Sequence, residues 1–182
     1  MIIRISTIVF MLGIIALPFG FEELKAVEKT DMSAQSLAEN NKETVAVLFA
    51  DVLNNGTLNI IGEYVSAEFI GPQGQSGPEG FAIPIKDLRL GFSDIQWTIQ
   101  EIVAENDKVA VRWTLQGTHD GTYNGIGATG KNVNSSGMAI FKFRDGLIVE
   151  STILTDRLGF LQQIGVIPVN LGLTPSTSTA KK

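Results

Sequence analysis

The spacing of hydrophobic positions changes about halfway along the chain, and this change predicts helices first and strands afterwards. Before residue 95, apolar side chains recur every three or four positions, which is typical of helices that bury one face. From Ile95 onward, apolar and polar side chains alternate, which is typical of strands. Helices followed by a run of antiparallel strands indicate an α+β fold in which the helices pack on one face of a sheet.

Three helices are expected before residue 95. The first and clearest one has a buried stripe made of Val45, Leu48, Phe49, Val52 and Leu53, and Gly56 is placed to end it. A short second helix is expected to carry Ile60, Ile61 and Tyr64. The composition of residues 71–80, rich in Gly, Pro and Gln, predicts a loop. A third helix should follow with Pro84 in its first turn, where proline is tolerated, and with one apolar side formed by Phe81, Ile85, Leu88 and Phe92.

The second half predicts a sequence of strands joined by turns. Residues 95–99 alternate, Asn106-Asp107 forms a turn, and the next strand has one face made of Val109, Val111, Trp113 and Leu115. A glycine-rich loop over residues 121–130 leads into a strand over residues 133–144. Asp145-Gly146 predicts a tight hairpin into a strand over residues 147–154. A final short helix is expected from about Asp156 to Gly165.

Both ends of the chain differ from its middle. Residues 5–19 are almost continuously apolar and follow Arg4, which favours a secretory signal over residues 1–20 and export to the periplasm or the outside of the cell. The alternative is an uncleaved N-terminal membrane anchor, although the apolar run falls slightly short of a spanning helix. Residues 21–40 are polar and indicate a linker or a loose helix. Residues 41–168 form the predicted domain, and residues 169–182 have the low complexity of a disordered tail.

Composition narrows the possible chemistry. Hydrophobic residues make up 44% of the 182 residues and charged ones 18%, as in a globular domain. The net charge is −5 and no basic cluster precedes Lys181-Lys182, so nucleic acid is not an expected partner. Without cysteine the chain has no disulfide or thiolate, and a single histidine excludes a His-rich zinc site. The glycines of residues 121–127 do not join a strand to a helix, so no dinucleotide site is expected.

Asp156 is the first candidate for catalytic chemistry. It follows an apolar strand, and strand alternation places it on the same face as Leu154 and Thr152. A carboxylate at the mouth of an apolar cavity would have its pKa raised by desolvation and could move a proton to and from a carbon acid. The alternative is that Asp156 caps the last helix, and spacing alone favours this second interpretation.

His119 is the second candidate, because alternation places it on the face of Trp113 and Leu115. It could donate a hydrogen bond to a substrate carbonyl, or it could be an ordinary histidine held by a loop carbonyl. The aromatic residues of the strands could line a pocket or simply form the core. The residues that we predict to contact a substrate are Trp97, Trp113, Leu115, Thr152 and Leu154.

An ordered series of short motifs resembles the SnoaL-like polyketide cyclase (ester cyclase) family of the NTF2-like superfamily. No single motif is diagnostic, and together they cover about seven tenths of the chain. In order they are Gly77-Pro78-Glu79-Gly80, Phe92-Ser93-Asp94-Ile95, Val109-Ala110-Val111-Arg112-Trp113-Thr114, Gly117-Thr118-His119, Thr129-Gly130-Lys131, Phe143-Arg144-Asp145-Gly146-Leu147 and Asp156-x-Leu158-Gly159 with the residues up to Gly165. The chain departs from many relatives at Gly71-Pro72, where they carry Asp-His, and at Thr152, where they carry Trp.

The resemblance implies a cone-shaped barrel in which a curved antiparallel sheet wraps around three N-terminal helices and encloses a deep apolar pocket. It also implies a homodimer formed across the sheet, and ring closure by aldol chemistry without cofactor or metal. In this family one aspartate is the general acid/base, and it corresponds to Asp156, while the Gly-x-His motif corresponds to His119.

Two functions are therefore expected as alternatives. The first is cofactor-independent acid/base chemistry, namely cyclisation, isomerisation or hydrolysis, on a small hydrophobic carbonyl compound. The second is a non-catalytic carrier or sensor of a small hydrophobic molecule.

Overall fold

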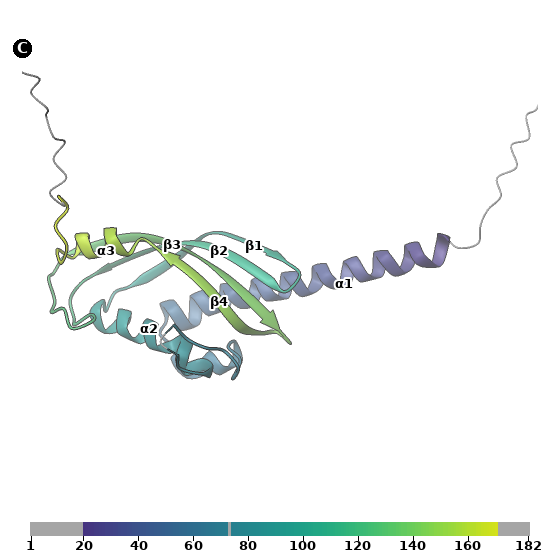
Figure 1. Ribbon diagram of the computed structural model, residues 1–182, viewed down its shortest axis with the longest axis horizontal. Coiled ribbons are helices and arrows are strands. Elements are labelled where there is room, and N and C mark those ends of the chain that lie inside the picture. The colour runs from purple at the N-terminus through teal and green to yellow at the C-terminus, as the bar shows by residue number, and fades with distance from the viewer. Residues whose placement is uncertain (1–19, 73, 171–182) are drawn as a thin grey trace, which may run out of the picture. The chain divides into compact units, whose positions relative to one another are not determined.

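The computed structural model describes residues 20–72 and 74–170, with side chains from residue 33 onward. Helices come first and four strands follow, as the hydrophobic spacing predicts (Figure 1). The elements are α1 Gly20–Val47, η1 Leu48–Asn54, η2 Leu58–Glu63, α2 Gly77–Gly91, β1 Gln96–Glu105, β2 Lys108–Thr118, β3 Asn132–Arg144, β4 Leu147–Thr155 and α3 Arg157–Gln163.

The chain divides into two compact units, residues 1–33 and residues 34–182. The described part of the first unit is the helical stretch 20–33, so residues 21–40, for which a linker and a loose helix were both open, belong to α1. None of the described helices is long and apolar enough to cross a membrane. Most of the predicted N-terminal signal and of the predicted C-terminal tail lies outside the described residues. The second unit, described over residues 34–72 and 74–170, contains the sheet.

The predicted stripe of the first helix is buried, but the helix changes its type along the stripe. The five stripe residues are at most 7% exposed. From Leu48 the α-helix passes into the π-helix η1, whose wider turn is visible where Asn55 N donates to Ala50 O over 3.1 Å. At the end of η1, Arg89 of α2 donates to the carbonyls of Leu53 and Asn54 over 2.8 and 3.1 Å. These carbonyls lack partners within the helix, so Arg89 ties η1 to α2.

The predicted boundary of the third helix is wrong. α2 begins at Gly77, whereas a start after Gly80 was predicted. Pro84 therefore lies in the helix interior. The loop predicted over residues 71–80 keeps only its first six residues. Pro78 explains the early start, because proline at the first helical positions has the required φ and lacks an N–H that would be unpaired there. The predicted short second helix is the 3-10 helix η2, which buries Ile61.

The four strands form one antiparallel sheet in the order β1-β2-β3-β4. Asn106 has a φ of 53°, and Asp145 and Gly146 have φ of 52° and 77°, so both predicted turns are confirmed. The predicted β2 face is also confirmed, since Val109, Val111, Trp113 and Leu115 are all buried. The curved sheet lies over α2, as Figure 1 shows, and the core fills the space between its inner face and the helices.

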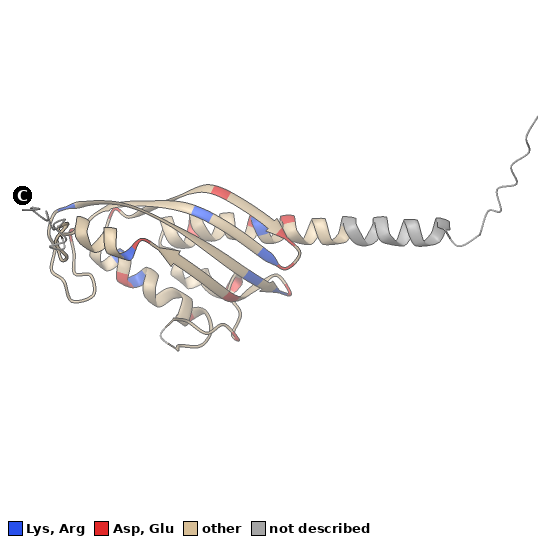
Figure 2. Cartoon of the chain, turned by 45° about the horizontal axis from the view of Figure 1, so that its top comes forward, with Lys and Arg blue, Asp and Glu red and all other residues tan. Residues whose placement is uncertain are grey.

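Charged side chains lie on the outer face of the sheet, on the helices and in the loops, with both signs interspersed (Figure 2). Three cross-element or within-helix pairs illustrate the mixture: Arg112 with Glu101 at 3.3 Å, Lys86 with Glu79 at 2.8 Å, and Arg144 with Glu68. All six side chains are exposed, so each pair contributes little to stability.

Candidate functional site

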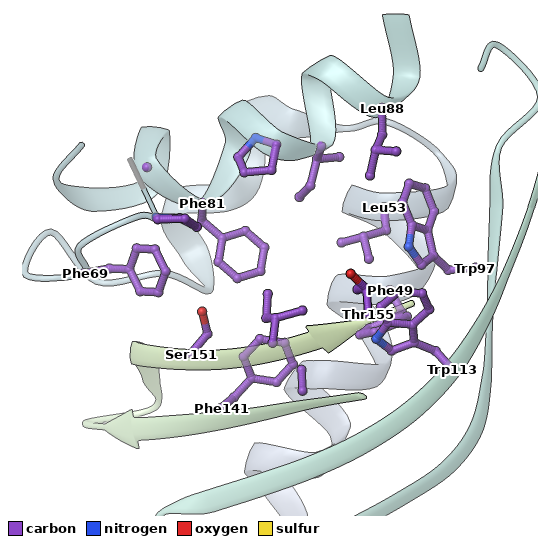
Figure 3. Close-up of a pocket in the computed structure, with 16 residues that line it drawn as sticks. Phe49, Leu53, Phe69, Phe81, Leu88, Trp97, Trp113, Phe141, Ser151 and Thr155 are labelled. Carbon is purple, nitrogen blue, oxygen red and sulfur yellow. The ribbon is translucent and has the colours of Figure 1, made fainter. Parts of the chain in front are cut away.

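The main candidate site is a cavity of about 210 Å³ between the inner face of the sheet and the helices η1 and α2 (Figure 3). It is clearly larger than the roughly 150 Å³ that holds benzene in an engineered protein cavity. All four strands and both helices contribute. The lining consists of Phe49, Leu53, Phe69, Pro72, Gly80, Phe81, Pro84, Ile85, Leu88, Trp97, Trp113, Ala139, Phe141, Ser151, Ile153 and Thr155.

No side chain in this lining is ionisable. The only polar side-chain groups are the hydroxyls of Ser151 and Thr155 and the indole N–H groups of Trp97 and Trp113, and none of the four forms a hydrogen bond with the described residues. Both tryptophans of the chain therefore face one cavity. The arrangement can hold an apolar molecule and can direct a few hydrogen bonds at it.

Two local features position the tryptophans. The side-chain amide of Asn54, at the end of η1, accepts from Trp97 N over 2.7 Å and donates to Trp97 O over 2.9 Å, so it joins η1 to β1 at the cavity. Trp113 depends on a glycine, because its indole lies over Gly137 of β3. A Cβ at position 137 would overlap Cζ2 of the indole, so only glycine admits this ring position.

The structure places Asp156 at the N-terminus of α3, as the helix-cap interpretation predicts. Its Oδ1 accepts from Gly159 N over 2.8 Å, and the side chain is exposed. It does not line the main cavity. It does line a smaller hollow of about 90 Å³, hereafter the side hollow, formed by Leu88, Trp113, Leu115, Tyr123, Ser135, Thr155, Asp156, Arg157 and Phe160. The side hollow shares Leu88, Trp113 and Thr155 with the main cavity.

The structure places His119 in the core, beyond the end of β2. Its side chain is fully buried, its ring stacks on Phe92 with centroids 4.9 Å apart, and Nδ1 lies 3.0 Å from Oγ1 of Thr129. Nε2 is buried without a hydrogen-bond partner among the described residues. His119 lines neither the main cavity nor the side hollow, so the two predicted catalytic residues do not meet around one space.

The predicted substrate contacts divide between the two faces of the sheet. Trp97 and Trp113 line the main cavity and Leu115 lines the side hollow. Thr152 and Leu154 lie on the outer face, because β4 turns Ser151, Ile153 and Thr155 inward. The register explains this: Ile153 pairs with Ala139 and Thr155 with Gly137, whose positions on β3 face the helices. The residues of β4 that face the cavity were therefore missed, since apolar residues occupy both faces of this strand and hide the alternation.

Within the part of the chain that the structure describes, two titratable groups have clearly shifted pKa values. Burial raises the pKa of the Tyr123 phenol in the side hollow. Hydrogen bonds from the hydroxyl and the backbone N–H of Ser93 lower the pKa of Asp120, which lies in the loop after β2. Neither group faces the main cavity. Within residues 33–72 and 74–170, no cluster of three or more His, Asp or Glu side chains is suited to hold a metal ion.

Comparisons with known proteins agree with this architecture. The model of the SnoaL-like polyketide cyclase family matches residues 43–164. Among solved structures, a protein of Jannaschia sp. CCS1 assigned as a SnoaL-like polyketide cyclase is 26% identical, with a TM-score of 0.65 over 72% of this chain and 96% of that one. TsrD from Streptomyces laurentii is 27% identical, with a TM-score of 0.61 over 75% and 97%. IdmH from Streptomyces antibioticus, assigned as a polyketide cyclase, is 28% identical, with a TM-score of 0.59 over 69% and 99%.

No curated protein sequence matches the chain. The solved structures share the curved sheet over helices of the NTF2-like fold, so the predicted fold class is confirmed.

Proposed function

Because the chain belongs to the SnoaL-like polyketide cyclase family, which suggests a cofactor-independent cyclase-type function, we propose that it binds a small hydrophobic molecule in the main cavity. The observation that carries this proposal is a lining of sixteen residues without one ionisable side chain. Burial of apolar ligand surface supplies the affinity, at about 25 cal/mol per Å² removed from water. A carrier needs no more than such a cavity.

A quenching experiment tests the proposal directly, because Trp97 and Trp113 are the only tryptophans and both line the cavity. Bromobenzene, a neutral apolar quencher somewhat larger than benzene, should quench the tryptophan fluorescence with saturation. Iodide should quench far less, since a charged ion is costly to bring into an apolar space.

A matched pair of variants assigns the quenching to the cavity. Ala139→Leu places three further carbon atoms in the lining and should weaken bromobenzene binding by about tenfold or more. Ala110→Leu makes the same change on the outer face of β2 and should leave binding unaltered. Thermal melting checks that both variants fold, and Ser151→Leu replaces Ala139→Leu if that variant does not. Equal binding by the filled variant and the outer-face variant would contradict the proposal.

A second candidate function, acid/base catalysis on the bound molecule, is favoured by the position of Asp156. The side hollow that it borders shares Trp113 and Thr155 with the main cavity. A ligand that extends past Thr155 would bring a carbon next to a carbonyl group within reach of the Asp156 carboxylate. The carboxylate would remove a proton from that carbon, and the protonated acid would return it after bond formation.

Acetophenone in D₂O provides a probe of this second candidate, because removal and return of a methyl proton exchanges it for deuterium. We expect the protein to accelerate the exchange, followed by NMR, and Asp156→Asn to abolish the acceleration. General-base catalysis typically contributes about 10²- to 10⁴-fold. Asn caps a helix as well as Asp, so this variant should keep its stability, whereas Asp156→Ala should lose about 0.5–2 kcal/mol.

The outcome separates the two roles of Asp156. Equal exchange rates with the original protein and with Asp156→Asn, at unchanged stability, would leave the aspartate as a helix cap alone. Binding of a small hydrophobic molecule would then stand without the reaction.

A further inference from the structure

We infer that the indole N–H of Trp113 and the hydroxyl of Thr155, on either side of Gly137, bind the carbonyl oxygen of a neutral apolar ligand. This inference rests on the proposed function and adds to it the class and the orientation of the ligand. The two donors would fix one end of the molecule near the junction of the main cavity and the side hollow.

Strand register brings the two donors together. Gly137 of β3 pairs with Trp113 of β2 on one side and with Thr155 of β4 on the other. Residues directly opposite in antiparallel strands have Cβ atoms about 4.5–5.5 Å apart. Because position 137 has no side chain, nothing on β3 separates the indole of Trp113 from the side chain of Thr155.

The position of the indole keeps its ring nitrogen close to this place. The atoms that would overlap a Cβ of residue 137 are Cζ2, Cη2 and Cε2 of Trp113. Cε2 is bonded to the ring nitrogen, so this nitrogen is one bond away from the ring atoms that cover Gly137. Figure 3 shows Trp113 and Thr155 at the same end of the cavity, with Ser151 at the other end near Phe69.

Both donors are free to serve a ligand. Within the described residues, neither the indole N–H of Trp113 nor the hydroxyl of Thr155 has a hydrogen-bond partner. An indole N–H can only donate, and a hydroxyl can donate as well. The group that satisfies both is an oxygen acceptor with two lone pairs, which is the chemistry of a ketone, ester or lactone carbonyl.

The rest of the lining decides that the ligand is neutral. A carboxylate would also accept two hydrogen bonds, but the main cavity offers no cationic side chain to pair with it, and in the side hollow Arg157 stands next to the acidic Asp156. The cost of burying an unpaired charge exceeds what two neutral donors return. The volume of about 210 Å³ suits a single ring with a short substituent.

Three probes of nearly the same shape test the inference by ligand-observed NMR titration of the full chain. Acetophenone carries the carbonyl, α-methylstyrene replaces its oxygen with a methylene group, and benzoate carries a charge. We expect acetophenone to bind about three- to tenfold more tightly than α-methylstyrene, because hydrogen bonds between neutral groups typically contribute an affinity gain of this size. Benzoate should bind most weakly.

The readout that identifies the donors is the ratio of the two affinities, because a general loss of packing weakens both probes. Trp113→Phe keeps a ring and removes the N–H, and Thr155→Val keeps the shape and removes the hydroxyl. Each should lower the ratio, and the double variant should bring it close to one. Gly137→Ala, which displaces the indole, should also lower the ratio. Thr152→Val, the matched change on the outer face of β4, should leave the ratio as it is.

The results distinguish this inference from the proposed function. If acetophenone and α-methylstyrene bind equally to the original protein, or if the ratio survives Trp113→Phe and Thr155→Val, the inference is wrong while the cavity still binds. If neither neutral probe binds, both the proposed function and the inference fail.

Discussion

Ser93 and Asp120 show how single side chains fasten the loop after β2 to the end of α2. The backbone N–H of Ser93 donates to Oδ1 of Asp120 over 2.9 Å, and its hydroxyl donates to Oδ2. Beside them, the backbone N–H groups of Asp120 and Gly121 both donate to the carbonyl of Gly91. These contacts hold the chain where it leaves β2, next to the buried ring of His119. They also lower the pKa of Asp120, mainly through the Ser93 hydroxyl.

The lowered pKa of Asp120 predicts a loss of stability in acid. A carboxyl whose pKa is lower in the folded protein stabilises it fully above the unfolded pKa, near the ordinary value of 3.8, and this stabilisation is lost as pH falls through the folded pKa. Urea unfolding between pH 6 and pH 2 measures this decline in the free energy of unfolding. Ser93→Ala and Asp120→Asn should each flatten the decline below about pH 3.8, and their double variant should add nothing to Asp120→Asn. If the free energy of unfolding falls equally with pH in the original protein, both single variants and the double variant, Asp120 is not the cause of the acid sensitivity.

The π-helix η1 contributes to the cavity both through its lining residues and through a contact that joins it to β1. It supplies Phe49 and Leu53 to the lining, and its last residue Asn54 pairs with both backbone groups of Trp97. π-Helical turns often occur at functional sites. The hydrophobic stripe was predicted correctly because a π-turn changes which residues face inward by only one position per turn. The helix type itself was missed, because the same stripe fits an α-turn and a π-turn, and the partners of η1, Arg89 and β1, are distant in sequence.

Loss of the Asn54 amide should destabilise the protein, because it leaves the N–H and C=O of Trp97 unpaired in a half-buried place. We expect Asn54→Ala to lower the free energy of unfolding by about 1–3 kcal/mol. Asn55→Ala is the matched control, because Asn55 is exposed and the hydrogen bond of its side chain, to Asp51 over 3.3 Å, is also exposed. Its effect should stay within about 0.5 kcal/mol in urea unfolding. A similar loss for both variants would show that the pairing with Trp97 contributes nothing specific.

At the scale of the whole molecule, the fold provides two different sheet faces. The inner face holds the main cavity, while the outer face carries exposed Met138, Ile140 and Leu154, with Met138 and Leu154 paired in register. The homodimer that the family resemblance implies would use this outer face, and it stays a prediction that sedimentation would test. Export through the N-terminal segment also stays a prediction, because residues 1–19 lie outside the described part of the chain.

The candidate site was predictable in part, and particular residues show where prediction stopped. Trp97 and Trp113 were identified because they stand on strands with clear alternation, and both line the cavity. Thr155 and Ser151 were missed, because β4 has apolar residues on both faces and its inward face follows from pairing with β3. For Asp156, spacing alone favours a helix cap and the family resemblance implies a catalytic role, and the structure shows the cap.

The sequence by itself determined the order of helices and strands, both tight turns and the buried face of β2. These depend on local spacing and on backbone preferences within a few residues. Only the tertiary structure decided which face of β4 closes the cavity, that Gly137 admits the indole of Trp113, and that Asp156 and His119 lie apart. Such features arise from contacts between side chains of strands and helices that are far apart in the chain. Local spacing carries no information about these tertiary contacts.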